Sequence, residues 1–236
     1  MGLSDYKKWT KYFAARDVDI QNQVPIVQRA YARVGLIGNP SDGFHGKTIA
    51  LSIKNFWAEA TIFESPRLNL IPHPLNDPTS FGNLADLHVI SKKEGYMGGL
   101  RLVQATCKKF YEFCDVNGIA LPRRNFTLRY ILLRNIQLRN DLFSYDTNIP
   151  RQVGLAGSSA IVTATLNCLM KFFNLTESDL SKPRRASFIL NVEMTELFIQ
   201  AGLQDRVIQV YEGLVYMDFD KDLFDKQGEY LRYNVI

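Results

Sequence analysis

The residues best suited to chemistry form a glycine- and serine-rich turn at 150–161, with the sequence PRQVGLAGSSAI. Gly154 and Gly157 can adopt the positive φ values that point successive backbone N–H groups into one concavity. Ser158 and Ser159 stand where a helix N-terminus leaves further N–H groups unpaired, and apolar residues at helical spacing follow them. This pattern predicts a phosphate-binding turn at the start of a packed helix. The serine hydroxyls could also ligate the magnesium that accompanies a nucleotide.

The glycine turn has a simpler interpretation, and a second segment of the chain partly resembles a phosphate-binding loop. Glycine and serine are common at helix starts, so the turn could simply cap a helix. Gly46-Lys47-Thr48 has the ending of a Walker A loop, but Ser41 stands five positions before Gly46, where that motif requires glycine. A Walker A loop also opens a helix, whereas TIALSI at 48–53 is β-branched and strand-like. We therefore expect no P-loop there, although Lys47 could still face an anion.

The elements that must position the turn follow a mixed α and β pattern. Strands are predicted at 34–37, at 48–63 as two separate strands (TIALSI and NFWAEATIF), from 125 to 128 and at 213–219. Helices are predicted at 98–115, from Ala160, at 187–200 and at 204–211. The expected buried stripes are Leu100, Val103, Cys107, Phe110, Tyr111 and Cys114 on the first helix, and Ile161, Ala164, Leu166, Leu169, Phe172 and Phe173 on the second.

Composition excludes several classes of function. The chain has 236 residues, of which 46% are hydrophobic and 22% charged, as in ordinary globular proteins. Its net charge of +4 comes from scattered lysines and arginines, so we expect no nucleic-acid partner. No apolar run approaches the roughly 18 residues of a membrane span, and no leader is evident. We expect a cytoplasmic protein without a membrane partner.

The reactive residue types outside the turn give no alternative chemistry. The three cysteines, at 107, 114 and 168, lack CxxC spacing, so no disulfide framework is expected. The three histidines, at 45, 73 and 88, have no partner at metal-ligand spacing, which argues against structural zinc. No Gly-x-Ser-x-Gly elbow supports a serine hydrolase.

Three segments, in order, resemble the motifs of the galactokinase, homoserine kinase, mevalonate kinase and phosphomevalonate kinase (GHMP) superfamily. The glycine turn is similar to its second motif, YARVGLIGNPSD at 31–42 to its first, and AGLQDR at 201–206 to the segment with its catalytic aspartate. Within the superfamily, RVGLIGNPSD, YDTNIPRQ, AGLQDRV and GLVYMDF resemble the glucuronokinase family, whose members make glucuronic acid 1-phosphate from ATP. The match spans about residues 29–220.

The resemblance implies a fold and a nucleotide site. The fold would be a single α/β (α+β) domain of the ribosomal-S5-domain-2-like, two-layer kind, a mixed sheet with helices on one face. It would occupy residues 29–236 as the ATP-binding N-terminal domain, after an extension at 1–28. The cofactors would be ATP and Mg²⁺. The nucleotide-binding residues would be Pro150, Gly154, Leu155, Ala156, Gly157, Ser158, Ser159 and Ala160.

The resemblance also implies roles in phosphoryl transfer. Asp205 would be the catalytic base and Arg33 the arginine that holds and ionises it, since a nearby cation favours a carboxylate. Ser159 and Glu193 would bind magnesium, with Glu196 as the alternative ligand. Two simpler interpretations remain open: Glu193 as a solvated helix residue, and Asp205 as the N-cap of the helix that follows it.

The substrate expected from the resemblance is a sugar acid. Asp42 would accept a sugar hydroxyl, while Asn39-Pro40 replaces the Glu-His of galactokinase-like sequences and argues against galactose. The carboxylate of a uronic acid requires a cation, which Arg206, Lys47 or Arg151 could supply. We take Arg206 as the candidate substrate contact, and the sequence alone does not choose among the three.

Two departures from the family pattern leave alternatives open. The third family motif, in a C-terminal domain, has no counterpart before Ile236, and an insert occupies about residues 129–143. The leading hypothesis is a kinase that transfers the ATP γ-phosphate to the anomeric hydroxyl of D-glucuronate. The alternatives are a truncated, non-catalytic nucleotide- or sugar-binding relative and a GHMP kinase for another sugar. A missing domain would also favour self-association through the face it leaves.

Overall fold

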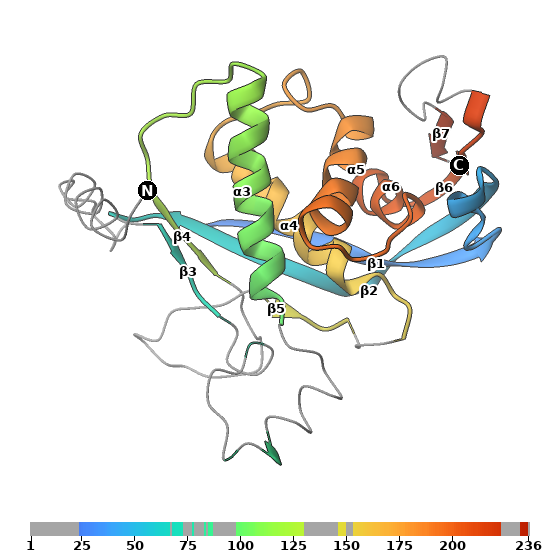
Figure 1. Ribbon diagram of the computed structural model, residues 1–236, viewed down its shortest axis with the longest axis horizontal. Helices are drawn as coiled ribbons and strands as arrows, with labels where there is room; N and C mark the ends of the chain where they lie inside the picture. The colour runs from blue at the N-terminus through green and yellow to red at the C-terminus, as the bar shows by residue number, and fades with distance from the viewer. Residues whose placement is uncertain are drawn as a thin grey trace.

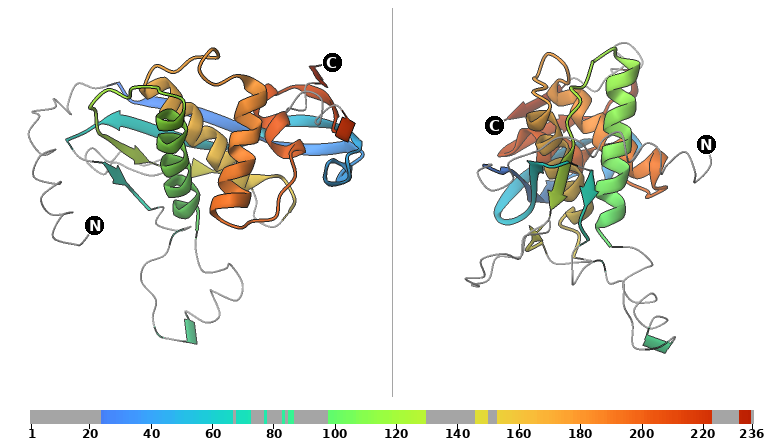
Figure 2. Two further views of the ribbon diagram at one scale, coloured as in Figure 1. Left: turned by 45° about the horizontal axis from the view of Figure 1, so that its top comes forward. Right: turned by 90° about the vertical axis from the view of Figure 1, so that its left-hand side faces the viewer.

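A mixed β-sheet covered on one face by helices carries the candidate site (Figures 1 and 2). The structure is a computed structural model that describes residues 24–66, 68–72, 77, 83, 85–86, 98–129, 146–149, 153–222 and 232–235. The two-layer α/β architecture with helices on one face, expected from the sequence, is confirmed.

The sheet is organised around one long central strand, β2 (Lys47–Glu64). One edge of β2 pairs antiparallel with β1 (Ile26–Ile37) along almost its whole length. Its other edge pairs in turn with β6 (Leu214–Asp218), β5 (Asp146–Thr147) and β4 (Phe126–Arg129). The sheet is completed by β3 (Asn69–Leu70), parallel to β4, and by β7 (Arg232–Val235), antiparallel to β6.

The prediction of two strands at 48–63 was wrong in one respect, because both halves belong to β2. The pairing register with β1 jumps between Tyr31↔Trp57 and Ala32↔Ile53, so that residues 54–56 have no partner in β1. Such a bulge bends a strand without ending it. The predicted break at residue 54 therefore falls on a real irregularity, while β1 keeps both halves in one sheet.

Among the residues that the structure describes, four longer helices pack over the sheet: α3 (Leu100–Val116), α4 (Gly157–Phe172), α5 (Lys182–Asn191) and α6 (Gln204–Tyr211). A 3₁₀ turn, η1 (Ser41–Phe44), joins β1 to β2, and a π-helical turn, η2 (Val192–Glu196), extends α5. The prediction for α6 is confirmed at both ends. The predicted helix at 187–200 begins earlier, at Lys182, and the predicted helix from Ala160 begins at Gly157.

The predicted buried stripes describe α4 and α3 incompletely. Helix α4 lies between the sheet and the other helices (Figure 1), and it is buried on nearly all sides, polar residues such as Thr163 and Thr165 included. On α3, Tyr111 is exposed rather than buried, and Leu102 and Thr106 face the core instead. The inward face of α3 is thus rotated from the predicted one.

Several sequence-based expectations lie outside the described residues. They concern residues 1–23 of the N-terminal extension, residues 130–143 of the insert, His73, His88, and Pro150 and Arg151 of the glycine turn. Within the described ranges, no helix is both long and apolar enough to cross a membrane. The three cysteines are free thiols.

Candidate functional site

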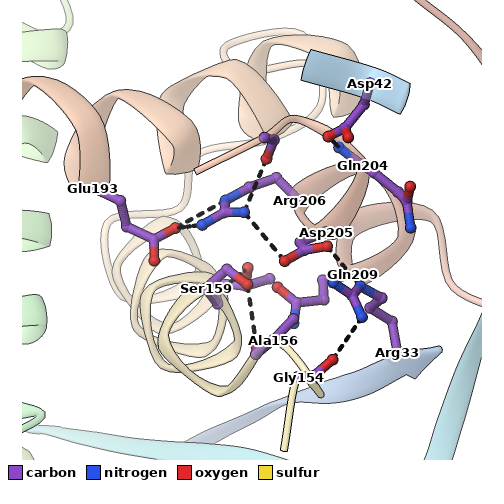
Figure 3. A network of polar contacts seen from close by, with 12 residues as sticks. Arg33, Asp42, Gly154, Ala156, Ser159, Glu193, Gln204, Asp205, Arg206 and Gln209 are labelled. Carbon is purple, nitrogen blue, oxygen red and sulfur yellow. Dashed lines mark hydrogen bonds and ion pairs between the residues drawn. The ribbon is translucent and has the colours of Figure 1, made fainter. Parts of the chain in front are cut away.

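The site lies where β1, the glycine turn and α6 meet, and Arg33 holds these three elements together (Figure 3). Arg33 comes from β1 and is 8% exposed. Its Nε donates to Asp205 Oδ1 at 2.6 Å, and its Nη1 donates to the carbonyl oxygen of Gly154 at 2.7 Å. One guanidinium therefore joins the three segments that the sequence singled out, although they are far apart along the chain.

The glycine turn has two left-handed residues, as predicted, but one of them is not a glycine. Gly154 has φ +73°, as expected, whereas the second left-handed residue is Ala156, with φ +60°. Gly157 is the first residue of α4, so its predicted positive φ was wrong. A Cβ atom at Gly157 would lie 3.5 Å from Ile149 Cγ2, an ordinary contact. We expected glycine at both left-handed positions because the left-handed conformation destabilises alanine by about 1–2 kcal/mol.

The first turn of α4 leaves backbone donors open. Its earliest intrahelical hydrogen bond runs from Ala160 N to Ala156 O, and no side chain caps the N-terminus. Ser159 Oγ instead donates to Ala156 O at 3.1 Å. The interpretation of the two serines as simple helix caps is therefore wrong. The amides that open α4 remain available to an anion, in the geometry typical of phosphate sites.

Asp205 stands in the first turn of α6 between two guanidinium groups. Leu203 is the N-cap residue of α6, so the interpretation of Asp205 as an N-cap was wrong. Besides its bond to Arg33, Asp205 places Oδ2 3.3 Å from Arg206 Nη1. The side chain is 20% exposed, so that the carboxylate is oriented by the protein and still accessible to a ligand.

Glu193 and Arg206 form a buried ion pair beside Asp205 (Figure 3). Arg206 donates to Glu193 Oε2 through Nε at 2.8 Å and also through Nη2, and donates to the carbonyl of Gly202 through Nη1 at 2.8 Å. Glu193 has no exposed surface, which rules out the solvated-residue interpretation. A carboxylate at such a depth is stable only when it is paired, and Arg206 supplies that pairing.

The structure places Arg206 among protein carboxylates, where it links Glu193 to Asp205. It is 3% exposed, and every nitrogen of its guanidinium has a protein partner. Its assignment as a substrate contact stays a prediction. Lys47, one of the other two candidate cations, is 64% exposed and lies 3.6 Å from Asp218 Oδ2. Lys47 and Thr48 belong to strand β2, which confirms that GKT is not a P-loop.

Asp42 joins the first motif to the segment that carries Asp205. Its Oδ2 accepts a hydrogen bond from the backbone N–H of Gln204, the first residue of α6, at 3.0 Å. A Cβ atom at residue 202 would lie 2.1 Å from Asp42 Oδ2, so a larger residue than Gly202 would displace the Asp42 carboxylate. Asp42 therefore fixes the start of α6, the helix that carries Asp205. Its role in binding a sugar hydroxyl stays a prediction.

The predicted magnesium ligands meet one chemical requirement of a metal site. Glu193 Oε1 is buried and has no hydrogen-bond partner, which leaves one carboxylate oxygen free. The described residues contain no cluster of three or more His, Cys, Asp or Glu side chains suited to a metal. Magnesium at nucleotide sites usually takes one or two protein ligands and completes its shell with phosphate and water. Glu193 keeps one oxygen without a hydrogen bond for such a site, and the alternative ligand Glu196 pairs with Lys108 of α3. The assignment of Ser159 and Glu193 as magnesium ligands stays a prediction.

Sequence reasoning missed Gln209, a polar residue of the site. Gln209, on α6, donates from Nε2 to the carbonyl of Ala156 at 2.8 Å. No motif marks this residue. The available signal was its position four residues after Asp205, which places both side chains on one face of α6.

The comparisons with known proteins agree with the three motifs. Residues 125–213 match the family model of the GHMP kinases N terminal domain. Glucuronokinase 1 of Arabidopsis thaliana is 47% identical over 210 residues, covering 89% of this chain and 53% of the relative. Probable glucuronokinase 2 of the same plant is 49% identical over 201 residues, covering 85% and 50%. The chain thus spans about half the length of the curated relatives it matches.

Solved structures give the same fold. The crystal structure of Lactococcus lactis galactokinase complexed with galactose superimposes with a TM-score of 0.61 at 16% identity. The superposition covers 98% of this chain and 51% of the galactokinase. At this level of identity the likeness bears on the fold alone.

Proposed function

We propose that this chain, which belongs to the GHMP kinase family, is the nucleotide-binding part of a sugar-1-kinase that phosphorylates D-glucuronate from ATP. The observation that carries the proposal is the double contact of Arg33, which joins Asp205 to the glycine turn. Phosphoryl transfer needs an acceptor for the proton of the attacking hydroxyl close to a phosphate cradle. These are the two parts that Arg33 connects.

In this proposal the glycine turn binds the phosphates of ATP. The open N–H groups at the start of α4 point toward the anion, and the N-terminus of the helix adds a favourable partial charge. Ser159 and Glu193 would hold Mg²⁺, which when bound spreads the negative charge of the phosphates. Arg206 stabilises the buried carboxylate of Glu193.

Asp205 accepts the proton of the anomeric hydroxyl in this proposal. The sugar oxygen attacks the γ-phosphorus, the bond from that phosphorus to the β–γ bridging oxygen breaks, and ADP leaves. Arg33 and Arg206 fix the orientation of the carboxylate from two sides. Asp42, hydrogen-bonded to the start of α6, would bind a sugar hydroxyl nearby. Arg206, Lys47 and Arg151 remain the candidates for the uronate carboxylate.

The test is an assay of the purified protein that contains this chain, with Mg²⁺ and ATP, against glucuronate, galactose and mevalonate. We expect ADP and glucuronic acid 1-phosphate to form at equal rates, and little product from the other two acceptors. Phosphorylation of galactose or mevalonate in preference to glucuronate would contradict the proposed substrate. MgATP binding without any acceptor phosphorylation would favour the non-catalytic alternative.

A cytoplasmic location is part of the same proposal. The three cysteines are free thiols, as is usual in reducing compartments. Fractionation of cells that express a tagged protein tests this part, and recovery in a membrane or secreted fraction would contradict it.

A further inference from the structure

Gln209 is a buried polar residue that the proposed mechanism does not use. It lies on α6 one turn after Asp205, between core residues, and is 3% exposed. Its Nε2 donates to the carbonyl of Ala156 at 2.8 Å, but its Oε1 is buried without a hydrogen-bond partner. Burying an unsatisfied carbonyl oxygen is unfavourable. An apolar side chain of similar size would avoid this penalty, so the contribution of Gln209 must come from its donor atom.

The acceptor of that donor is the strained residue of the glycine turn. Ala156 is the residue with φ +60°, in a region that alanine seldom occupies. Its carbonyl oxygen receives three donors: Ala160 N at 3.2 Å, Ser159 Oγ at 3.1 Å and Gln209 Nε2 at 2.8 Å. The first two belong to α4 itself, and Gln209 is the contact from another helix. Gln209 therefore ties the strained turn to α6 (Figure 3).

The contacts of Gln209 and Arg33 together fix the direction of three successive peptide groups. Arg33 donates to the carbonyl of Gly154 from Nη1 at 2.7 Å and to that of Leu155 from its backbone N–H at 3.4 Å. Gln209 holds the next carbonyl, that of Ala156. In a trans peptide the C=O and N–H bonds point in opposite directions. Because Arg33 and Gln209 hold these three carbonyls, the N–H groups of residues 155–157 point away from Arg33 and Gln209.

We propose that Gln209 is a positioning residue for nucleotide binding, which holds Ala156 left-handed so that the amides of the turn face the phosphates. Its effect on nucleotide affinity rests on the proposed function, but its effect on the turn does not. Because Asp205 and Gln209 share one face of α6, this helix fixes the turn at two points: through Arg33 at Gly154 and directly at Ala156.

The test compares Gln209→Met with a matched control, Thr165→Val, in the full chain. Methionine has nearly the volume of glutamine and lacks the donor, and it also removes the unsatisfied Oε1, so the variant should fold. Thr165 lies on α4, has no exposed surface and carries a buried hydroxyl without a partner. Its replacement removes a buried polar group of the core without touching the turn.

Two measurements separate positioning from general stability. Without nucleotide, amide hydrogen exchange at residues 154–160 should become about 3- to 10-fold faster in Gln209→Met, the range expected for one neutral hydrogen bond. With MgATP, the Kd and the KM for ATP should rise by a similar factor, about 3- to 10-fold, while the KM for glucuronate stays unchanged. Thr165→Val should leave all four quantities unchanged.

Unchanged exchange at 154–160 in Gln209→Met would overturn the positioning role, whatever the affinity for ATP. Faster exchange with an unchanged Kd would overturn the link to nucleotide binding. If the wild-type chain bound no MgATP, the proposed function would fail, while the exchange data would still decide whether Gln209 fixes the turn. Equal effects of Gln209→Met and Thr165→Val would mean that any buried polar group matters equally, and would also refute the proposal.

Discussion

Replacing Arg33 by lysine separates the charge of the residue from its geometry. Arg33 uses two different nitrogens, Nε for Asp205 and Nη1 for the carbonyl of Gly154, at 2.6 and 2.7 Å. A lysine ammonium is a single point donor on an unbranched stem and cannot reproduce this fork. We expect Arg33→Lys to keep at most one of the two hydrogen bonds.

The expected magnitude follows from the strength of these two hydrogen bonds. A hydrogen bond to a charged group contributes about 1.5–3 kcal/mol and one between neutral groups about 0.5–1.5 kcal/mol. The side chains of Arg33 and Asp205 are only 10% and 20% exposed, so solvent screens the pair weakly. Removal of one bond and distortion of the other should cost about 1–3 kcal/mol, or about 5- to 150-fold in kcat/KM.

The assay is steady-state glucuronate phosphorylation with ATP and glucuronate varied in turn, and Arg29→Lys is the matched control. Arg29 lies on the same strand, bonds Glu59 through Nε at 2.6 Å and stacks over Trp57, but its side chain is 42% exposed. The control should keep kcat/KM close to that of the wild type. Wild-type kcat/KM in Arg33→Lys, or an equal loss in both variants, would refute the role given to the two hydrogen bonds of the Arg33 guanidinium.

The remaining predictions use other residues of the site and core. Asp205→Asn should lower kcat by about two to four orders of magnitude with little change in the Kd for ATP, as for a positioned general base, and near-normal turnover in a coupled assay would refute that role. Gly157→Val should abolish MgATP binding in calorimetry, because the valine side chain would block the phosphates. The circular dichroism should stay unchanged, because the nearest atom to a Cβ there, Ile149 Cγ2, is 3.5 Å away. Equal affinity in the variant and the wild type would contradict a phosphate cradle. Burial, with a smaller contribution from the Asp179 carboxylate, raises the pKa of the Cys114 thiol from 9.0 to about 11, so alkylation of native protein by iodoacetamide at neutral pH should be slow. Because the pKa of Cys114 is higher in the folded state, the neutral thiol contributes stability that is complete below about pH 9 and is lost as the pH rises toward 11. Thermal unfolding measured across that pH range would detect the loss.

The parts of the fold that local pattern controls could be predicted from the sequence. Helix α6 was predicted at both ends because its apolar period is clear and glycines at 202 and 213 flank it. The division of β2 depends on its register with β1, a contact between distant residues that local sequence does not encode. Helix α4 is buried on nearly all sides because the sheet and other helices surround it, which a search for one apolar stripe cannot anticipate.

The site was predictable in its residues but not in its connections. Residue types and spacing pointed to the glycine turn, the resemblance to the GHMP family pointed to Arg33 and Asp205, and the structure brings all three together. No sequence pattern indicated that Glu193 would pair with Arg206, because Glu193 lies in a π-helical turn and a loop separates that turn from α6. The left-handed Ala156 was missed for a related reason, since distant donors hold an alanine where local propensity favours glycine.

In the proposed kinase, the glycine turn binds the phosphates of ATP and Asp205 faces the acceptor hydroxyl. A crystal structure of the protein with Mg²⁺, a non-hydrolysable ATP analogue and glucuronate tests it most directly. We expect phosphate oxygens at hydrogen-bond distance from the backbone N–H groups of residues 155–159, and the anomeric hydroxyl in contact with the carboxylate of Asp205. Phosphates bound elsewhere on the chain, or a sugar whose anomeric oxygen lies away from Asp205, would contradict it.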